Sequence, residues 1–155
     1  MINQINGKKR IFAIACIVLC ACAFILQFLP FWSHNGETSS INGYIWLPFT
    51  DEHKDLGNWI NSQTATPFKI DDILLFPSIS MVASAASVIL LIINAKSKRA
   101  FVLPLICALA GICAYNKPAS LFLSNLWPVH MAISVLLLVA SIGLAVFCFK
   151  KSENA

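Results

Sequence analysis

The chain has 155 residues, of which 58% are hydrophobic and 12% are charged, whereas soluble domains average roughly 45–50% and 25%. This composition excludes an ordinary water-soluble domain and indicates a protein whose apolar surface faces lipid. A net charge of +4 would suit a nucleic-acid-binding protein, but the basic residues gather in short segments beside apolar runs. That distribution is typical of membrane proteins, so we expect no nucleic-acid partner.

Four apolar runs divide the chain. A run of about 20 apolar residues crosses the hydrocarbon core as a helix, because a helix satisfies every backbone polar group internally. We therefore predict an all-α membrane protein, a bundle of four transmembrane helices in one domain covering residues 1–155. The predicted spans are 11–32, 73–94, 100–115 and 129–149, joined by an outer loop at 33–72, an inner turn at 95–99 and an outer loop at 116–128, with a tail at 150–155.

Charge predicts the orientation of these spans. Most of the basic residues lie beside the predicted spans on one side of the membrane: Lys8, Lys9, Arg10, Lys96, Lys98, Arg99, Lys150 and Lys151. Most of the acidic residues lie in the large loop on the other side: Glu37, Asp51, Glu52, Asp55, Asp71 and Asp72. Because Lys and Arg in short loops stay in the cytoplasm, both termini are predicted to be cytoplasmic. Short loops without an Asn-x-Ser/Thr site are compatible with a bacterial plasma membrane.

The first span resembles a signal peptide at its start, because three basic residues precede an apolar run. Its apolar character continues to Trp32, which is longer than the apolar core of roughly 7–15 residues in a signal peptide. We therefore expect an uncleaved helix that Pro30 ends.

The loop at 33–72 is long and aromatic, and we expect it to be structured. Asn42-Gly43 suits the turn of a small β-hairpin. Thr50 or Asp51 can cap a short helix that reaches Ile60. The aromatic side chains of the loop could form its core or bind a protein partner, and the candidate binding residues are Tyr44, Trp46 and Trp59.

Small and polar residues recur at spacings of three and four in every span, as expected for helix seams in a membrane, where close approach and hydrogen bonds drive association. The predicted seams are Ala13, Cys16, Cys20, Ala23 and Gln27; Ser80, Ser84, Ser87, Leu91 and Asn94; Pro104, Cys107, Gly111 and Ala114; and Ser134, Leu138, Ser141, Ala145 and Cys148. The third span is the shortest and reaches only about 24 Å. The segment 116–128 is therefore predicted to lie at the interface or to re-enter the membrane.

Three kinds of chemistry are open to this chain. The loop residues His34, Glu37, Asp51, Glu52, His53 and Asp55 could hold zinc or form a solvated acidic face. Cys16 and Cys20 could carry a soft metal or serve as small buried side chains. Small four-helix mercury carriers also have a cysteine pair in the first helix, and the chain resembles them in this respect. Haem ligation by His34 or His130 would require histidines that face each other inside the bundle.

No catalytic motif, cofactor loop or charged residue inside a span occurs in the sequence, so no metal, cofactor or enzymatic activity is predicted. The layout resembles four-span families with a large first outer loop, such as claudins, but lacks the loop cysteines and the Trp-Gly-Leu-Trp pattern of claudins. The leading hypothesis is an interaction or accessory subunit that binds a protein partner or a second copy of itself. The alternative is a small transporter or channel subunit for a soft metal or a neutral solute.

Overall fold

The computed structural model describes residues 7–29, 33–34, 37–38, 51–63, 69–114 and 126–149. Its elements, in chain order, are α1 (Gly7–Leu26), β1 (Ser33–His34), β2 (Glu37–Thr38), α2 (Asp51–Ser62), α3 (Ile70–Asn94), α4 (Val102–Cys113) and α5 (Trp127–Phe149). The described part of the chain is mainly helical, in agreement with the predicted class.

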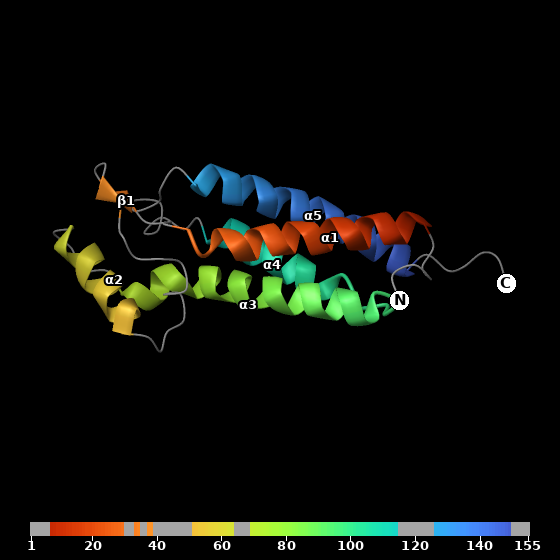
Figure 1. The fold of residues 1–155 in the computed structure, drawn as a ribbon, viewed down its shortest axis with the longest axis horizontal. Coiled ribbons are helices and arrows are strands. Elements are labelled where there is room, and N and C mark those ends of the chain that lie inside the picture. Colours follow the sequence, from red (N-terminus) through yellow and green to blue (C-terminus); the bar gives the residue numbers. More distant parts are fainter. Residues whose placement is uncertain are drawn as a thin grey trace.

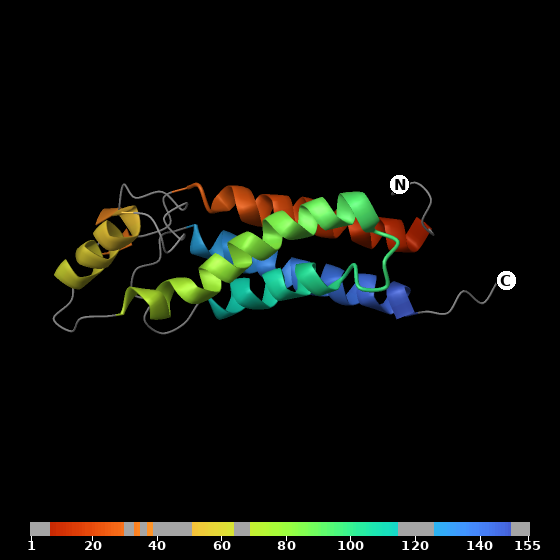
Figure 2. The same ribbon diagram turned by 90° about the horizontal axis from the view of Figure 1, so that it is seen from below.

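Four of these helices lie side by side as an elongated bundle (Figures 1 and 2). Helix α1 packs against α3 and α5, and α4 packs against the same two helices, so that α1 and α4 lie diagonally across the ring. The start of α1, the turn between α3 and α4 and the end of α5 share one end of the bundle, which we call the basic end. Helix α2 lies beyond the opposite end, which we call the α2 end.

Three helices are long and apolar enough to cross a membrane. They are α1, α5 and the stretch Leu75–Asn94 of α3. Helix α4 is equally apolar but has only 12 residues, which corresponds to about 18 Å of rise. Large apolar side chains such as Ile11, Val82 and Val139 are exposed on the outside of the bundle, as expected for a surface that contacts lipid.

Helix α1 begins four residues before the predicted span and ends six residues before its predicted end. The three basic residues Lys8–Arg10 continue the helix at its start because their long side chains are good helix formers. At its end, the amides of Gln27, Phe28 and Leu29 bond to carbonyls three residues earlier, so the last turn tightens. Pro30 follows, and a residue before proline avoids the helical conformation.

The bundle is held by small side chains, and the predicted seams largely match its core. All predicted seam residues of α1 and α4 are buried, and so are the first four of α3. Asn94 is the exception in α3, because it lies at the end of the helix and is exposed. In α5 the seam is broader than predicted, because Leu138 and Ala145 are only half-buried. The positions beside them are buried instead: Leu137, Ala140 and Leu144.

The loop between α1 and α3 contains the predicted short helix, which forms α2. The hairpin predicted at Asn42-Gly43 lies outside the described residues. The described strands are two residues long each, and they pair antiparallel with Ser33 opposite Thr38. The residues between them in the sequence, Asn35 and Gly36, form another Asn-Gly pair, a turn signal that the sequence analysis did not use.

The basic end is closed by contacts that are partly exposed. The ammonium group of Lys9 donates to the carbonyl oxygens of Lys96 at 3.2 Å and Ser97 at 3.4 Å, which joins the start of α1 to the turn after α3. Phe101 meets Phe149 edge to face, with ring centroids 5.5 Å apart. The turn at 95–101 therefore packs on both α1 and α5.

Candidate functional site

The most polar contact inside the bundle lies near the α2 end. The side-chain nitrogen Nε2 of Gln27, at the end of α1, is 3.1 Å from Nε2 of His130 in α5. Both side chains are buried, with 0% and 1% of their surface exposed. An amide nitrogen can only donate, so the imidazole nitrogen accepts this hydrogen bond. The oxygen Oε1 of Gln27 has no hydrogen-bond partner among the described residues.

The surroundings of His130 leave it little freedom. The indole of Trp127 lies 5.5 Å from the imidazole, centroid to centroid. On the α4 side, Gly111 approaches so closely that a Cβ there would meet Ser134 Oγ and would lie 3.3 Å from His130 Cε1. The hydroxyl of Ser134 donates to the carbonyl of His130 at 2.9 Å. Three helices thus fix the position of this imidazole.

A line of hydroxyl and thiol groups continues along the interior toward the basic end. Ser80 of α3 donates to the carbonyl of Cys107 in α4 at 3.3 Å, and the thiol of Cys107 returns a bond to the carbonyl of Ser80 at 3.5 Å. The thiol of Cys20 interacts with Cys107 and with Ser87. Cys20 and Cys107 belong to α1 and α4, so their contact crosses the ring of helices at its centre.

Further along, the serine hydroxyls bond to carbonyls of their own helices. Ser84 donates to Met81, Ser87 to Ala83 and Ser141 to Leu137, at 2.6 to 2.7 Å. Such a bond satisfies a buried hydroxyl without a second helix. These serines therefore fill space along the seams and donate their hydroxyl protons locally, while Ser87 and Ser141 also interact with the thiols of Cys20 and Cys16.

The buried cysteines of the bundle do not form a metal-binding cluster. Cys16, Cys20, Cys107 and Cys148 are buried and free, while Cys113 is exposed. Within the described ranges, no three side chains of the His, Cys, Asp and Glu types come close enough together to hold a metal ion. His130 faces Gln27 across the bundle, and the described residues place no second histidine opposite it.

The candidate partner-binding residues lie in the loop beyond the bundle. Tyr44 and Trp46 are outside the described residues. Trp59 lies in α2 and is half-buried, next to the buried Ile60. Of the proposed metal-binding residues, Asp51 is exposed and forms an exposed ion pair with Lys54 at 3.2 Å. Asp55 is also exposed, so the described acidic residues of α2 form a solvated face.

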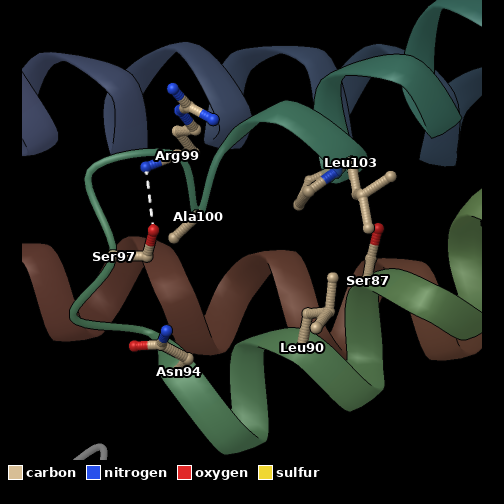
Figure 3. A pocket seen from close by; sticks show the side chains of 8 residues that line it. Ser87, Leu90, Asn94, Ser97, Arg99, Ala100 and Leu103 are labelled. Carbon is tan, nitrogen blue, oxygen red and sulfur yellow. Dashed lines mark hydrogen bonds between the residues drawn. The ribbon is translucent and has the colours of Figure 1, made fainter.

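A hollow opens at the basic end between α3 and α4. It has a volume of about 140 Å³, and its lining combines Leu90, Leu103 and Pro104 with the polar residues Asn94 and Ser97. Figure 3 shows Asn94 and Ala100 facing each other across the hollow, with Leu90 and Leu103 deeper inside. The hydroxyl of Ser97 accepts a hydrogen bond from the amide of Arg99 at 3.1 Å, which fixes the rim.

The sequence analysis considered His130 only as a possible haem ligand and missed its contact with Gln27. Gln27 lies near the end of α1 and His130 near the start of α5, so antiparallel packing brings them to the same level of the bundle. A comparison of the depths of the polar residues in the spans would have suggested this pair. The hollow was missed because its shape depends on how α3 and α4 diverge.

No protein-family model, no characterised protein and no solved structure matches this chain.

Proposed function

We propose that the protein is a four-span integral membrane protein that acts as a non-enzymatic interaction or accessory subunit. In this proposal α4 is the fourth span, and the basic end lies in the cytoplasm with both termini. The cationic residues of the basic end support this orientation, because the positive-inside rule places such residues on the cytoplasmic side. The bacterial plasma membrane is the membrane that we propose.

One observation carries this proposal: the interior of the bundle is filled by small side chains from all four helices. Cys20 and Cys107 meet at the centre, and Leu137 and Leu144 are fully buried beside the seam. No Asp, Glu, Lys or Arg is buried among the described residues, whereas ion and proton pathways through membranes normally contain such groups. Because the interior is filled and uncharged, we propose that the protein acts through its outer surface and its loops.

Candidate surfaces for a protein partner lie at the α2 end. Helix α2 projects beyond the bundle (Figure 1) and carries the half-buried Trp59. Aromatic residues are enriched where proteins bind each other because they bury a large area at low entropic cost. Tyr44 and Trp46 belong to the same loop in the sequence, and we propose that they contribute to the same surface.

Purification in a mild detergent tests this function. We expect a stoichiometric partner or a homo-oligomer, and Trp59→Ala should reduce its recovery by about tenfold, which is typical of an aromatic residue at the centre of an interface. The matched control is Asn58→Ala, which changes an exposed neighbour on the same helix. A monomer that retains no partner, with the wild-type chain folded, would contradict the proposal.

The second candidate is a transporter of a soft metal or a small neutral solute. The observation that favours it is the interaction of the Cys20 thiol of α1 with the Cys107 thiol of α4, in a core that also contains the buried Cys16 and Cys148. Thiols are suitable ligands for copper(I) and mercury. Cys16→Ser with Cys20→Ser should then abolish uptake or metal sensitivity, whereas Cys113→Ser on the exposed face should not. Unchanged uptake in the double variant would remove this candidate.

A further inference from the structure

We infer that the hollow at the basic end, together with the groove that continues from it between α3 and α4, binds one anionic phospholipid. The headgroup would lie at the rim formed by Asn94, Ser97 and Arg99, and an acyl chain would follow the groove toward Ala86. This inference rests on the proposed insertion of the four helices into a membrane. It goes beyond the proposed function, because it assigns a lipid ligand to a site that is separate from the proposed partner-binding surface at the α2 end.

The first argument is the continuity of the groove. A second hollow of about 400 Å³ lies on the same side of the bundle, and its lining consists of side chains from α3 and α4 such as Val82, Ala86 and Ile106. Leu103 borders both hollows, so they are consecutive parts of one groove. Ala86 lies about 12 Å along the helix axis from Asn94. That depth falls within one leaflet of a hydrocarbon core about 30 Å thick, where an acyl chain would lie.

The second argument is the change of chemistry along the groove. At the mouth, the amide of Asn94 and the hydroxyl of Ser97 provide hydrogen-bonding groups. Deeper inside, the lining is apolar, and the second hollow has almost entirely apolar walls. A phospholipid has the same order of groups, with a polar headgroup and ester region followed by a hydrocarbon chain.

The third argument is charge. The basic end carries six cations on α1 and on the α3–α4 turn, and the described residues at this end include no acid: Lys8, Lys9, Arg10, Lys96, Lys98 and Arg99. The guanidinium of Arg99 extends outward from the rim and away from the hollow in Figure 3. It is exposed and makes no hydrogen bond to a described side chain. Its side chain can therefore rotate over the mouth without breaking a hydrogen bond to a described residue, and it can then bind a phosphate.

The course of α3 helps to explain why a groove exists here. Helix α4 begins at Val102, directly after the turn, and packs against α3 as extensively as α1 packs against α5. Helix α3 runs obliquely across the bundle, as Figure 2 shows, so the two helices do not lie parallel along their whole length. A lipid in the groove would complete the packing of the shortest helix against its neighbour.

Binding should be measured by native mass spectrometry of the full chain in a non-ionic detergent. The probes are phosphatidylglycerol and phosphatidylcholine with identical acyl chains. Phosphatidylglycerol should be retained about tenfold better, because its phosphate is uncompensated, whereas the quaternary ammonium of phosphatidylcholine neutralises the phosphate and is repelled by the basic end. Equal retention of the two lipids would overturn the charge recognition, and competition by millimolar inorganic phosphate would identify a free-anion site instead.

Two substitutions with matched controls locate the site. Arg99→Gln should reduce phosphatidylglycerol binding by about five- to tenfold, whereas Arg10→Gln should reduce it by less than about twofold at 150 mM salt, where distant charges are screened. Ala100→Leu, which fills the hollow, should lower the retention of both lipids. Equal losses for the two arginine variants would mean a general attraction to the basic end, and an unchanged Ala100→Leu variant would exclude the hollow. Recovery of each variant from the membrane fraction separates a failure of this inference from a failure of membrane insertion.

Discussion

The two ends of the bundle are held together by different kinds of contact. At the α2 end, Gln27 and His130 bond inside the bundle, and the close approach of Gly111 encloses them. At the basic end, Lys9 bonds to exposed carbonyls, and a hollow remains between α3 and α4. The difference shows how position relative to water determines structure. A polar group buried between helices needs a fixed partner, whereas an exposed one can exchange its partner for water or a headgroup.

Overpacking at the α2 end should have the largest effect. Gly111→Leu would place a side chain against Ser134 and His130, both of which are buried. We expect a loss of about 2–3 kcal/mol in stability, measured as the loss of helicity in mixed micelles of increasing SDS content. Gly7→Leu is the control, because a Cβ at Gly7 meets nothing within 4 Å. If the two variants lost equal stability, the close packing of α4 on α5 would be disproved.

A glycine-to-leucine substitution nearer the basic end should reduce stability by less. Gly143→Leu would press against the ring of Phe12, which also stacks on Phe147 at 5.6 Å. Phe12 is only half-buried and can rotate toward lipid, so we expect about 1–2 kcal/mol of destabilisation. A larger loss than for Gly111→Leu in the same assay would reverse the proposed ranking of the two ends.

The coupling between Gln27 and His130 should be smaller again. A double-mutant cycle with Gln27→Met and His130→Phe removes the hydrogen bond while roughly keeping side-chain volume. We expect a coupling free energy of about 1 kcal/mol, in the upper half of the range for hydrogen bonds inside helical membrane proteins. The stabilities of the wild type, the two single variants and the double variant are measured by unfolding in SDS. Strict additivity of the two changes would show that the contact contributes no stability.

The exposed contact at the basic end should have the smallest effect. Lys9→Gln removes the bonds to the carbonyls of Lys96 and Ser97, and we expect less than about 0.5 kcal/mol because water replaces them. Limited proteolysis at the turn provides a second measurement, which should show slightly faster cleavage. A loss above about 1 kcal/mol would mean that this end is as tightly fixed as the other.

The sequence predicted those features that depend on local pattern. The three- and four-residue spacing of small side chains identified the buried face of α1 completely, because helix geometry alone places Cys16, Cys20 and Gln27 on one side. In α4 every predicted residue is buried, but Ala108 and Ala110 are buried as well. In α5 the pattern was ambiguous, since Leu137 and Leu138 are chemically identical and only packing against neighbouring helices selects Leu137.

Features that depend on the relative placement of helices were not accessible from the pattern. The spacing of Gln27 within its own span does not point to His130, and only a comparison of depths between antiparallel spans brings the two residues together. The hollow at the α3–α4 turn likewise depends on how the oblique helix α3 lies against α4. The aromatic loop residues Tyr44 and Trp46 remain a prediction from the sequence.

The side of the membrane on which each terminus lies tests the account most directly, because the number of spans determines whether the termini share a side. Reporter fusions to residue 1 and to residue 155, one active only in the cytoplasm and one active only outside it, provide this measurement. The account predicts that both termini lie in the cytoplasm, since α4 crosses the membrane despite having only 12 residues. Termini on opposite sides would show that α4 does not cross and would contradict the four-span bundle.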